Sequence, residues 1–353
     1  MMKSTRLSMI GCSIALMAFC SVGCETSTDP LQEARRLWLQ GDHKAARPIY
    51  EDYLAQNPQD YQLRFDYGQR LAQVDKAEAI RQLSQIPDDS SLAFEAARQV
   101  FAIATRVGDD QLAEEALKRM ERLQPDDTAV LLSLAEHYFR TMQYHNAEVY
   151  ARRTLEEDSE RAGTWLLLAE VLDELGRTAE AEQPLAEAYQ RNSNSYPIRA
   201  NYAYVLQFAG KLVEAEEHVS WCLDQKPGDP AMLGIKATIE RANGEFEQAL
   251  ETIRQATDAD PDQLSNRLLE ADLLIYQRQG EAAYEILKPL LSQHPNHRPL
   301  LAALARAAAI SGRRDEAVEY QERIAELIRV ATERETGNAE LQAPDTTDGV
   351  ADP

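Results

Sequence analysis

Cysteine is scarce in this sequence, and the usual catalytic signatures are missing from it. Three of the four cysteines fall within the first 24 residues, so only Cys222 lies in the remainder and no internal disulfide is expected. The sequence has no glycine-rich phosphate loop, HExxH, CxxC or nucleophile-elbow motif. We therefore expect no enzyme activity, no cofactor and no metal site.

Basic residues are also too few to balance the acidic ones. The chain has 37 Lys and Arg against 59 Asp and Glu, a formal net charge of −22. A polyanion would be repelled by this charge, which argues against nucleic acid as a partner. No segment shows the sustained apolar–polar alternation of a β-strand, so we expect an all-α fold.

Small residues recur with a period of 33 or 34 residues. One series consists of Ala46, Ala79, Ala113, Ala147, Ala181, Ala215, Ala249, Ala283 and Ala317. A second keeps the same spacing at Ala34, Gly68, Phe101, Ala135, Ala169, Ala203, Ala237, Ala271 and Ala305. A fixed period of this length indicates a supersecondary unit that stacks on its own copies.

Residues 162–195 show what the unit is. Apolar residues from Trp165 to Leu175 have helical spacing, and Gly176 follows where a helix end needs a left-handed residue. A second helical run ends at the polar residues 192–195. Each unit is therefore a pair of antiparallel helices, in which Ala169 and Ala181 allow the two backbones to approach closely.

This pattern resembles the tetratricopeptide repeat. The family's aromatic residue near the start of the first helix is Trp165, and other copies have Leu131, Arg199, Leu233 and Arg267 there. The hairpin glycine stands at 41, 108, 176, 210, 244 and 312; Met142 replaces it in one copy, and in the eighth copy it is displaced to Gly280. The closing proline is found at 58, 125, 227, 261 and 295.

The resemblance implies a right-handed superhelical solenoid of about nine antiparallel helix hairpins. We place the repeats near residues 27, 61, 94, 128, 162, 196, 230, 264 and 298, so that the solenoid covers 31–335 and ends in a capping helix from Asp315. The acidic residues 336–353 include Pro344 and no aromatic residue, and we expect them to be disordered.

Residues 1–23 form an export signal, because Lys3 and Arg6 precede an apolar stretch too short to span a bilayer. Ser21 to Cys24 resemble a bacterial lipoprotein box, with Cys24 as the lipid acceptor and 24–30 as a short linker. The residue after it, Glu25, argues by the same resemblance for the outer membrane, facing the periplasm. The alternative is ordinary cleavage and soluble export, because Ser21 and Gly23 also satisfy the small-x-small rule.

The family resemblance also places a binding groove on the first helices, at positions 2, 5, 9, 12 and 13 of each repeat. These positions hold Leu132, Glu136, Phe139, Arg140, Leu166, Glu170, Asp173, Glu174, Tyr204, Gln207, Phe208, Thr238, Arg241, Leu268, Asp272, Ile275 and Tyr276. The groove is apolar with an acidic stretch at Glu136, Glu170, Asp173 and Glu174, which suits a basic segment of a protein or a divalent cation. The Lys and Asn of the family's carboxylate clamp are absent.

Three functions fit this organisation. The first is a membrane-tethered scaffold or adaptor that binds proteins of an envelope assembly or secretion system and touches the membrane through its lipid anchor only. The second is an exported soluble chaperone or substrate carrier. The third is an accessory subunit of a polysaccharide-export or glycosylation enzyme complex.

Overall fold

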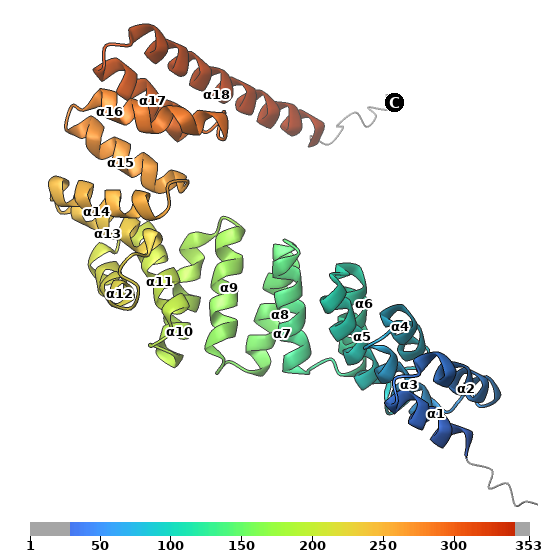
Figure 1. Cartoon of the computed structure of the whole chain (residues 1–353). Helices are drawn as coiled ribbons and strands as arrows, with labels where there is room; N and C mark the ends of the chain where they lie inside the picture. The colour runs from blue at the N-terminus through green and yellow to red at the C-terminus, as the bar shows by residue number, and fades with distance from the viewer. Residues whose placement is uncertain (1–28, 343–353) are drawn as a thin grey trace, which may run out of the picture. The chain divides into compact units, whose positions relative to one another are not determined.

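The computed structural model describes residues 29–342, and every regular element in this range is a helix (Figure 1). The predicted fold class, an all-α array of antiparallel helix hairpins, is confirmed. The export signal, Cys24 and nearly all of the 24–30 linker lie outside the described residues. The chain divides into two compact units, one up to Ala113 and one from Glu114 on, and each is described separately.

The first unit contains two complete hairpins and the first helix of a third. Its helices are α1 (Pro30–Leu39), α2 (His43–Gln56), α3 (Tyr61–Leu71), α4 (Lys76–Ser84) and α5 (Ala93–Val107). The unit boundary then falls inside α6 (Asp110–Leu123).

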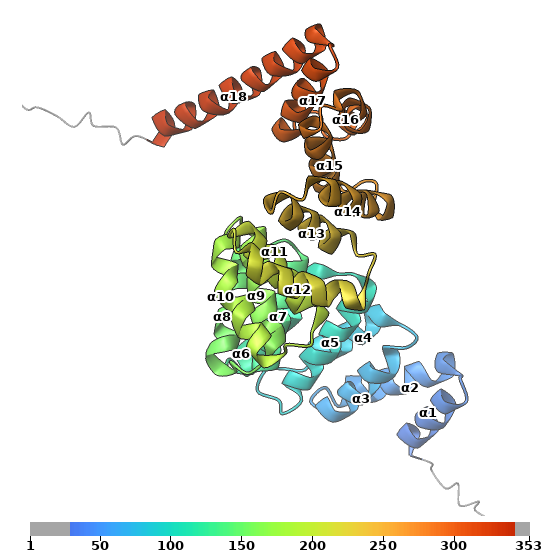
Figure 2. The same ribbon diagram turned by 90° about the vertical axis from the view of Figure 1, so that its left-hand side faces the viewer.

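The second unit holds six further hairpins that follow one another in chain order (Figure 2). They are α7 (Thr128–Arg140) and α8 (Tyr144–Glu157); α9 (Ala162–Glu174) and α10 (Glu182–Arg191); α11 (Tyr196–Phe208) and α12 (Leu212–Gln225); α13 (Pro230–Ala242) and α14 (Phe246–Ala259); α15 (Leu264–Tyr276) and α16 (Gly280–Leu287); α17 (Arg298–Ile310) and α18 (Arg314–Gln342). Two 3-10 helices, η1 (Thr178–Ala181) and η2 (Lys288–Ser292), adjoin α10 and α16.

The first helices of the hairpins begin where the periodicity predicts. They start at residues 30, 61, 93, 128, 162, 196, 230, 264 and 298, within three residues of the predicted starts. Aspartates fix several of these starts: the Asp127 carboxylate accepts hydrogen bonds from the amides of Ala129 and Val130, and Asp229 does the same at α13. The last helix differs, because α18 passes the expected end near residue 335 and Gly337, and continues to Gln342, two residues before Pro344.

The recurring alanines lie where the two helices of a hairpin meet. Ala203 in α11 and Ala215 in α12 have no exposed surface and share one apolar cluster with Val219 and Leu206. Ala237 and Ala249 are equally buried in the next hairpin. A larger side chain at these positions would force the helices apart, and such overpacking typically costs about 1–3 kcal/mol.

In eight of the nine hairpins of the described residues, the turn between the two helices contains one left-handed residue; the turn between α3 and α4 has none. Six glycines supply it, with φ between 72° and 84°. In the fourth repeat Met142 takes this conformation (φ 58°), and in the eighth Arg278 does (φ 63°). Our assignment of the eighth hairpin glycine to Gly280 is therefore wrong. Gly280 is instead the first residue of α16, where a Cβ would lie 2.7 Å from the Ile310 side chain.

In three repeats the side chain of the fourth residue makes the same kind of hydrogen bond, although leucine stands there at Leu131 and Leu233. The Trp165 indole donates to the carbonyl of Ser159, six residues earlier, at 2.8 Å. The guanidinium of Arg199 donates to Ser193 at 2.7 Å, and Arg267 does so to Pro261 at 3.1 Å. Tryptophan and arginine are interchangeable here because each combines a flat side chain with an N–H donor.

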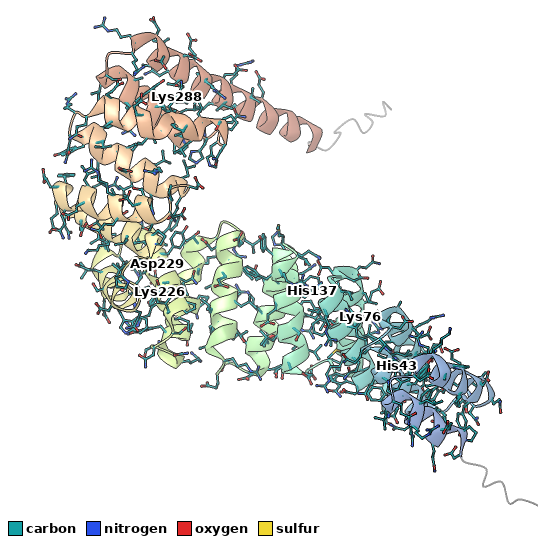
Figure 3. The ribbon with its side chains drawn as sticks, viewed as in Figure 1. His43, Lys76, His137, Lys226, Asp229 and Lys288 are labelled. Carbon is teal, nitrogen blue, oxygen red and sulfur yellow. The ribbon has the colours of Figure 1, made fainter. Side chains whose placement is uncertain are left out.

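Ion pairs and hydrogen bonds join the second half of one hairpin to the next. Arg153 of α8 pairs with Glu121 of α6 at 2.5 Å, and Arg177 pairs with Glu148 at 2.7 Å. Lys288, labelled in Figure 3, donates to the Tyr320 hydroxyl of α18 at 2.6 Å. These contacts connect one hairpin to the next, although exposed pairs of this kind contribute little individually.

The core of the sixth repeat contains a cysteine and a histidine. Cys222 is fully buried, and burial raises the pKa of its thiol to about 11, as expected of a small core residue rather than a reactive thiol. His218 lies between the rings of Tyr189 and Tyr202, with ring centroids 4.9 and 4.8 Å away. Burial and the positive charge of Arg199 lower the pKa of His218, outweighing the opposite effect of nearby glutamates.

Exchanging the turn residues of the eighth repeat tests the corrected assignment. We expect Arg278→Gly to stabilise the protein by about 1 kcal/mol, because glycine adopts the left-handed conformation without strain. Gly280→Ala should destabilise it, because the added Cβ meets Ile310. Urea unfolding measures both changes, and the opposite pair of signs would restore the original assignment.

His218 should make stability depend on pH. Since its folded pKa is lowered, the unfolded chain binds the proton first, and stability should fall as the pH drops below about 6.5. The charged groups near the ring, Arg199, Glu214 and Glu217, are retained in a His218→Phe variant. Unfolding free energies of this variant and the wild type should run parallel above pH 7.5 and diverge below pH 6.5; parallel curves throughout would contradict the assignment.

Candidate binding groove

The first helices of the second unit pack side by side and present a shared face. Neighbouring pairs include α7 with α9, α11 with α13, and α13 with α15. We call the outward face of α7, α9, α11, α13 and α15 the groove. Thirteen of the groove residues are our candidates for partner contact: Leu132, Glu136, Phe139, Leu166, Glu170, Asp173, Glu174, Tyr204, Phe208, Arg241, Leu268, Asp272 and Tyr276. All thirteen lie on these five helices and keep at least part of their surface exposed.

A cavity of about 610 Å³ opens on α11, α13 and α15. Four of the thirteen candidates line it: Tyr204, Arg241, Leu268 and Asp272. The other lining residues are Ala200, Asn201, Gln207, Ala231, Met232, Gly234, Ile235, Thr238, Gln263, Ser265, Asn266 and Leu269. Of these, Ala200, Gln207, Ala231, Gly234, Thr238 and Ser265 also lie at the repeat positions that the family resemblance assigns to the groove.

The cavity exists because α13 has small residues on this face. Its fifth position is Gly234, where α9 and α15 have Leu166 and Leu268. The side-chain oxygen of Asn266 occupies the space that a Cβ on residue 234 would take. The Asn266 amide donates to the Pro230 carbonyl at 2.9 Å, which fixes the floor of the cavity to the start of α13.

Arg241 is the cation of the cavity without a partner. Arg241 is half-buried as a residue, and its guanidinium has no hydrogen bond or ion pair with any residue from 29 to 342. Asp272, on the neighbouring helix, is instead paired with Arg306 of α17 at 2.6 Å. Asp272 is thus already paired, which leaves the positive charge of Arg241 available to bind a carboxylate.

The predicted acidic stretch lies beside the cavity on α7 and α9. Burial raises the pKa of Glu136 and of Glu170; an amide hydrogen bond from Asn201, at 3.2 Å, partly offsets the effect for Glu170. Asp173 accepts from the Thr178 hydroxyl at 2.5 Å, and Glu174 is hydrogen-bonded to a tyrosine hydroxyl. None of the four carboxylates pairs with a cation within residues 29–342, so together they favour a basic segment.

Three aromatic candidates are strongly exposed. Tyr204 is 41% exposed, Phe208 61% and Tyr276 63%. Tyr204 lines the cavity, whereas Phe208 and Tyr276 do not. The Tyr276 ring stacks on Phe246 of α14, with centroids 4.1 Å apart. Rigid aromatic surfaces of this kind are the usual anchors of protein interfaces.

The remaining candidates are half-buried apolar residues. Leu132 and Leu166 occupy the same position on α7 and α9. Phe139 packs near Tyr144, with ring centroids 5.8 Å apart. They widen the apolar surface of the groove next to the acidic stretch.

No group of three or more His, Cys, Asp or Glu side chains in residues 29–342 is arranged to hold a metal ion. In the same range, no helix has the length and apolarity needed to cross a bilayer.

Family models described as "Tetratricopeptide repeat" match most of the chain. One matches residues 31–91, 132–197 and 203–263, and the other matches residues 240–307. The chain belongs to the tetratricopeptide repeat family. Tetratricopeptide repeat proteins are generally interaction modules without catalytic activity, and their stacked first helices form extended binding surfaces.

Several solved structures are similar in fold to this chain. A chain of the APC/C hetero-tetramer Cut9–Hcn1 aligns with a TM-score of 0.53 and 12% identity, over 80% of this chain and 56% of that one. The type IV pilus biogenesis factor PilW aligns with a TM-score of 0.49 and 19% identity, over 61% of this chain and 100% of that one. YrrB, a tetratricopeptide protein with an unusual peptide-binding site, aligns with a TM-score of 0.45 and 20% identity, over 54% of this chain and 94% of that one. No curated protein matched.

Proposed function

We propose that this tetratricopeptide repeat protein is a membrane-tethered scaffold of the bacterial envelope, which binds a protein partner along the groove within an assembly or secretion system. One observation carries the proposal: the groove combines carboxylates without cationic partners, exposed aromatic rings and a cavity. A polypeptide could meet all three, with basic side chains at the carboxylates, apolar side chains at the aromatic rings, and an apolar side chain in the cavity.

The tether is inferred from the sequence. Ser21 to Cys24 resemble a lipoprotein box behind a cationic, apolar export signal. Acyl chains on Cys24 would anchor the chain, because each buried methylene contributes about 0.8 kcal/mol. By the same resemblance, Glu25 favours the outer membrane, which would present the groove to partners in the periplasm.

Soluble export is the competing interpretation. Ser21 and Gly23 also satisfy the small-x-small rule for ordinary cleavage. The protein would then bind its partner through the same groove as a periplasmic chaperone or carrier. The two functions therefore differ only in whether Cys24 is acylated.

Truncating the groove aromatics should weaken partner binding. A photo-crosslinking amino acid placed at position 207 in cells captures the partner, whose affinity is then measured with purified protein. We expect Tyr204→Ala, Phe208→Ala and Tyr276→Ala each to cost about 2 kcal/mol, because large buried side chains dominate interface energies. Val213→Ala, an exposed apolar position on α12, is the matched control. Loss of binding in the control alone would place the interface on the second helices.

Replacing Cys24 tests the tether. We expect Cys24→Ser to block lipidation and to release the protein from membranes or stall its processing, whereas Cys222→Ser should leave its location unchanged because Cys222 is buried. Metabolic labelling with a palmitate analogue and membrane fractionation measure the two effects. Unlabelled wild-type protein in the soluble periplasmic fraction would establish the soluble alternative.

A further inference from the structure

We propose that the cavity on α11, α13 and α15 recognises an extended segment of a partner protein in which a bulky apolar residue stands beside an aspartate or glutamate. The apolar side chain enters the cavity, and the carboxylate binds Arg241. This inference rests on the protein-binding part of the proposed function and adds the chemistry of the segment that is bound.

The size and lining of the cavity suit one large apolar side chain and its backbone. Its volume of about 610 Å³ lies within the range of about 300–1,000 Å³ typical of ligand pockets. The floor consists of small or apolar side chains, among them Ala200, Gly234 and Ile235. An aromatic or leucine side chain would bury apolar surface there without displacing a protein group.

Arg241 determines the sign of the charge that the bound segment carries next to its apolar side chain. Arg241 is half-buried as a residue and its guanidinium is unpaired within the described residues, whereas Asp272 is already paired with Arg306. A carboxylate could accept two parallel hydrogen bonds from Arg241, which would replace hydrogen bonds to water that the side chain loses when partly buried. A basic side chain would be repelled at this point, although the acidic stretch on α7 and α9 attracts one farther along the groove.

Polar groups at the rim can hold an extended backbone. Gln207 occupies the same repeat position on α11 as Arg241 on α13. Its side-chain amide has no partner among residues 29–342, so it can donate to one peptide group and accept from another. An extended segment needs such partners because its own amides and carbonyls are unpaired.

The test is selection of peptides from a phage-displayed library of random linear heptapeptides on the full-length chain in detergent. We expect the wild type to enrich peptides with a bulky apolar residue next to Asp or Glu. The Arg241→Glu variant should instead select peptides with Lys or Arg in place of that acid. Ala200→Leu, which introduces the residue that α9 and α15 have at this position, should select smaller apolar residues. Arg314→Glu, an exposed arginine on α18, should select the wild-type peptides.

The strongest selected peptide then gives a quantitative measure by fluorescence anisotropy. A version of this peptide with Asn or Gln in place of its Asp or Glu should bind the wild type about tenfold more weakly, a typical loss for one partly buried charged pair. The same replacement should have no effect on binding to Arg241→Glu. Circular dichroism on each variant shows that the helices are retained.

Several results would overturn the inference. These are failure of the wild type to enrich any peptide with a bulky apolar residue next to Asp or Glu, or an acid preference that persists in Arg241→Glu. Light scattering that shows dimers sensitive to Ala200→Leu would assign the cavity to a second copy of the chain. None of these outcomes affects the Cys24 test or partner capture through the groove, so the scaffold function stands or falls separately.

Discussion

Close contact between two helices at a small residue is the constraint on which the array depends. Ala203 and Ala215 have no exposed surface, and the same is true of Ala237 and Ala249 one repeat later. Because the helices of a hairpin meet at these points, larger residues such as Leu206 and Val219 can fill the space around them. The period of the small residues therefore determines the period of the hairpins, and it does so through packing rather than through helix propensity.

This constraint explains which parts of the fold could be predicted from sequence. The repeat starts followed from the alanine period, because a shift of even one residue would turn large side chains into the contact. The turn of the eighth repeat could not be predicted correctly, because Arg278 takes a conformation that usually selects glycine while Gly280 is required by contact with Ile310. A glycine in the sequence does not reveal which of these two constraints it satisfies.

The site was predictable to the level of the face, but not of the cavity. The family positions placed Tyr204, Arg241, Leu268 and Asp272 on one surface, and all four line the cavity. The cavity itself depends on Asn266, which lies at a normally apolar position and fills the space beside a glycine. Contacts between different repeats, such as Asp272 with Arg306, decide which charges remain available, and a single repeat carries no information about them.

The distribution of paired charges separates the two sides of the hairpins. Glu121 and Glu148 on the second helices each have an arginine partner from a neighbouring hairpin. Glu136 and Glu170 on the first helices have none among the described residues, although burial disfavours their charged forms. If these carboxylates served only solubility, full exposure would suit them better. Their position without cations is consistent with the proposed basic partner, which would supply the charge that the fold leaves out.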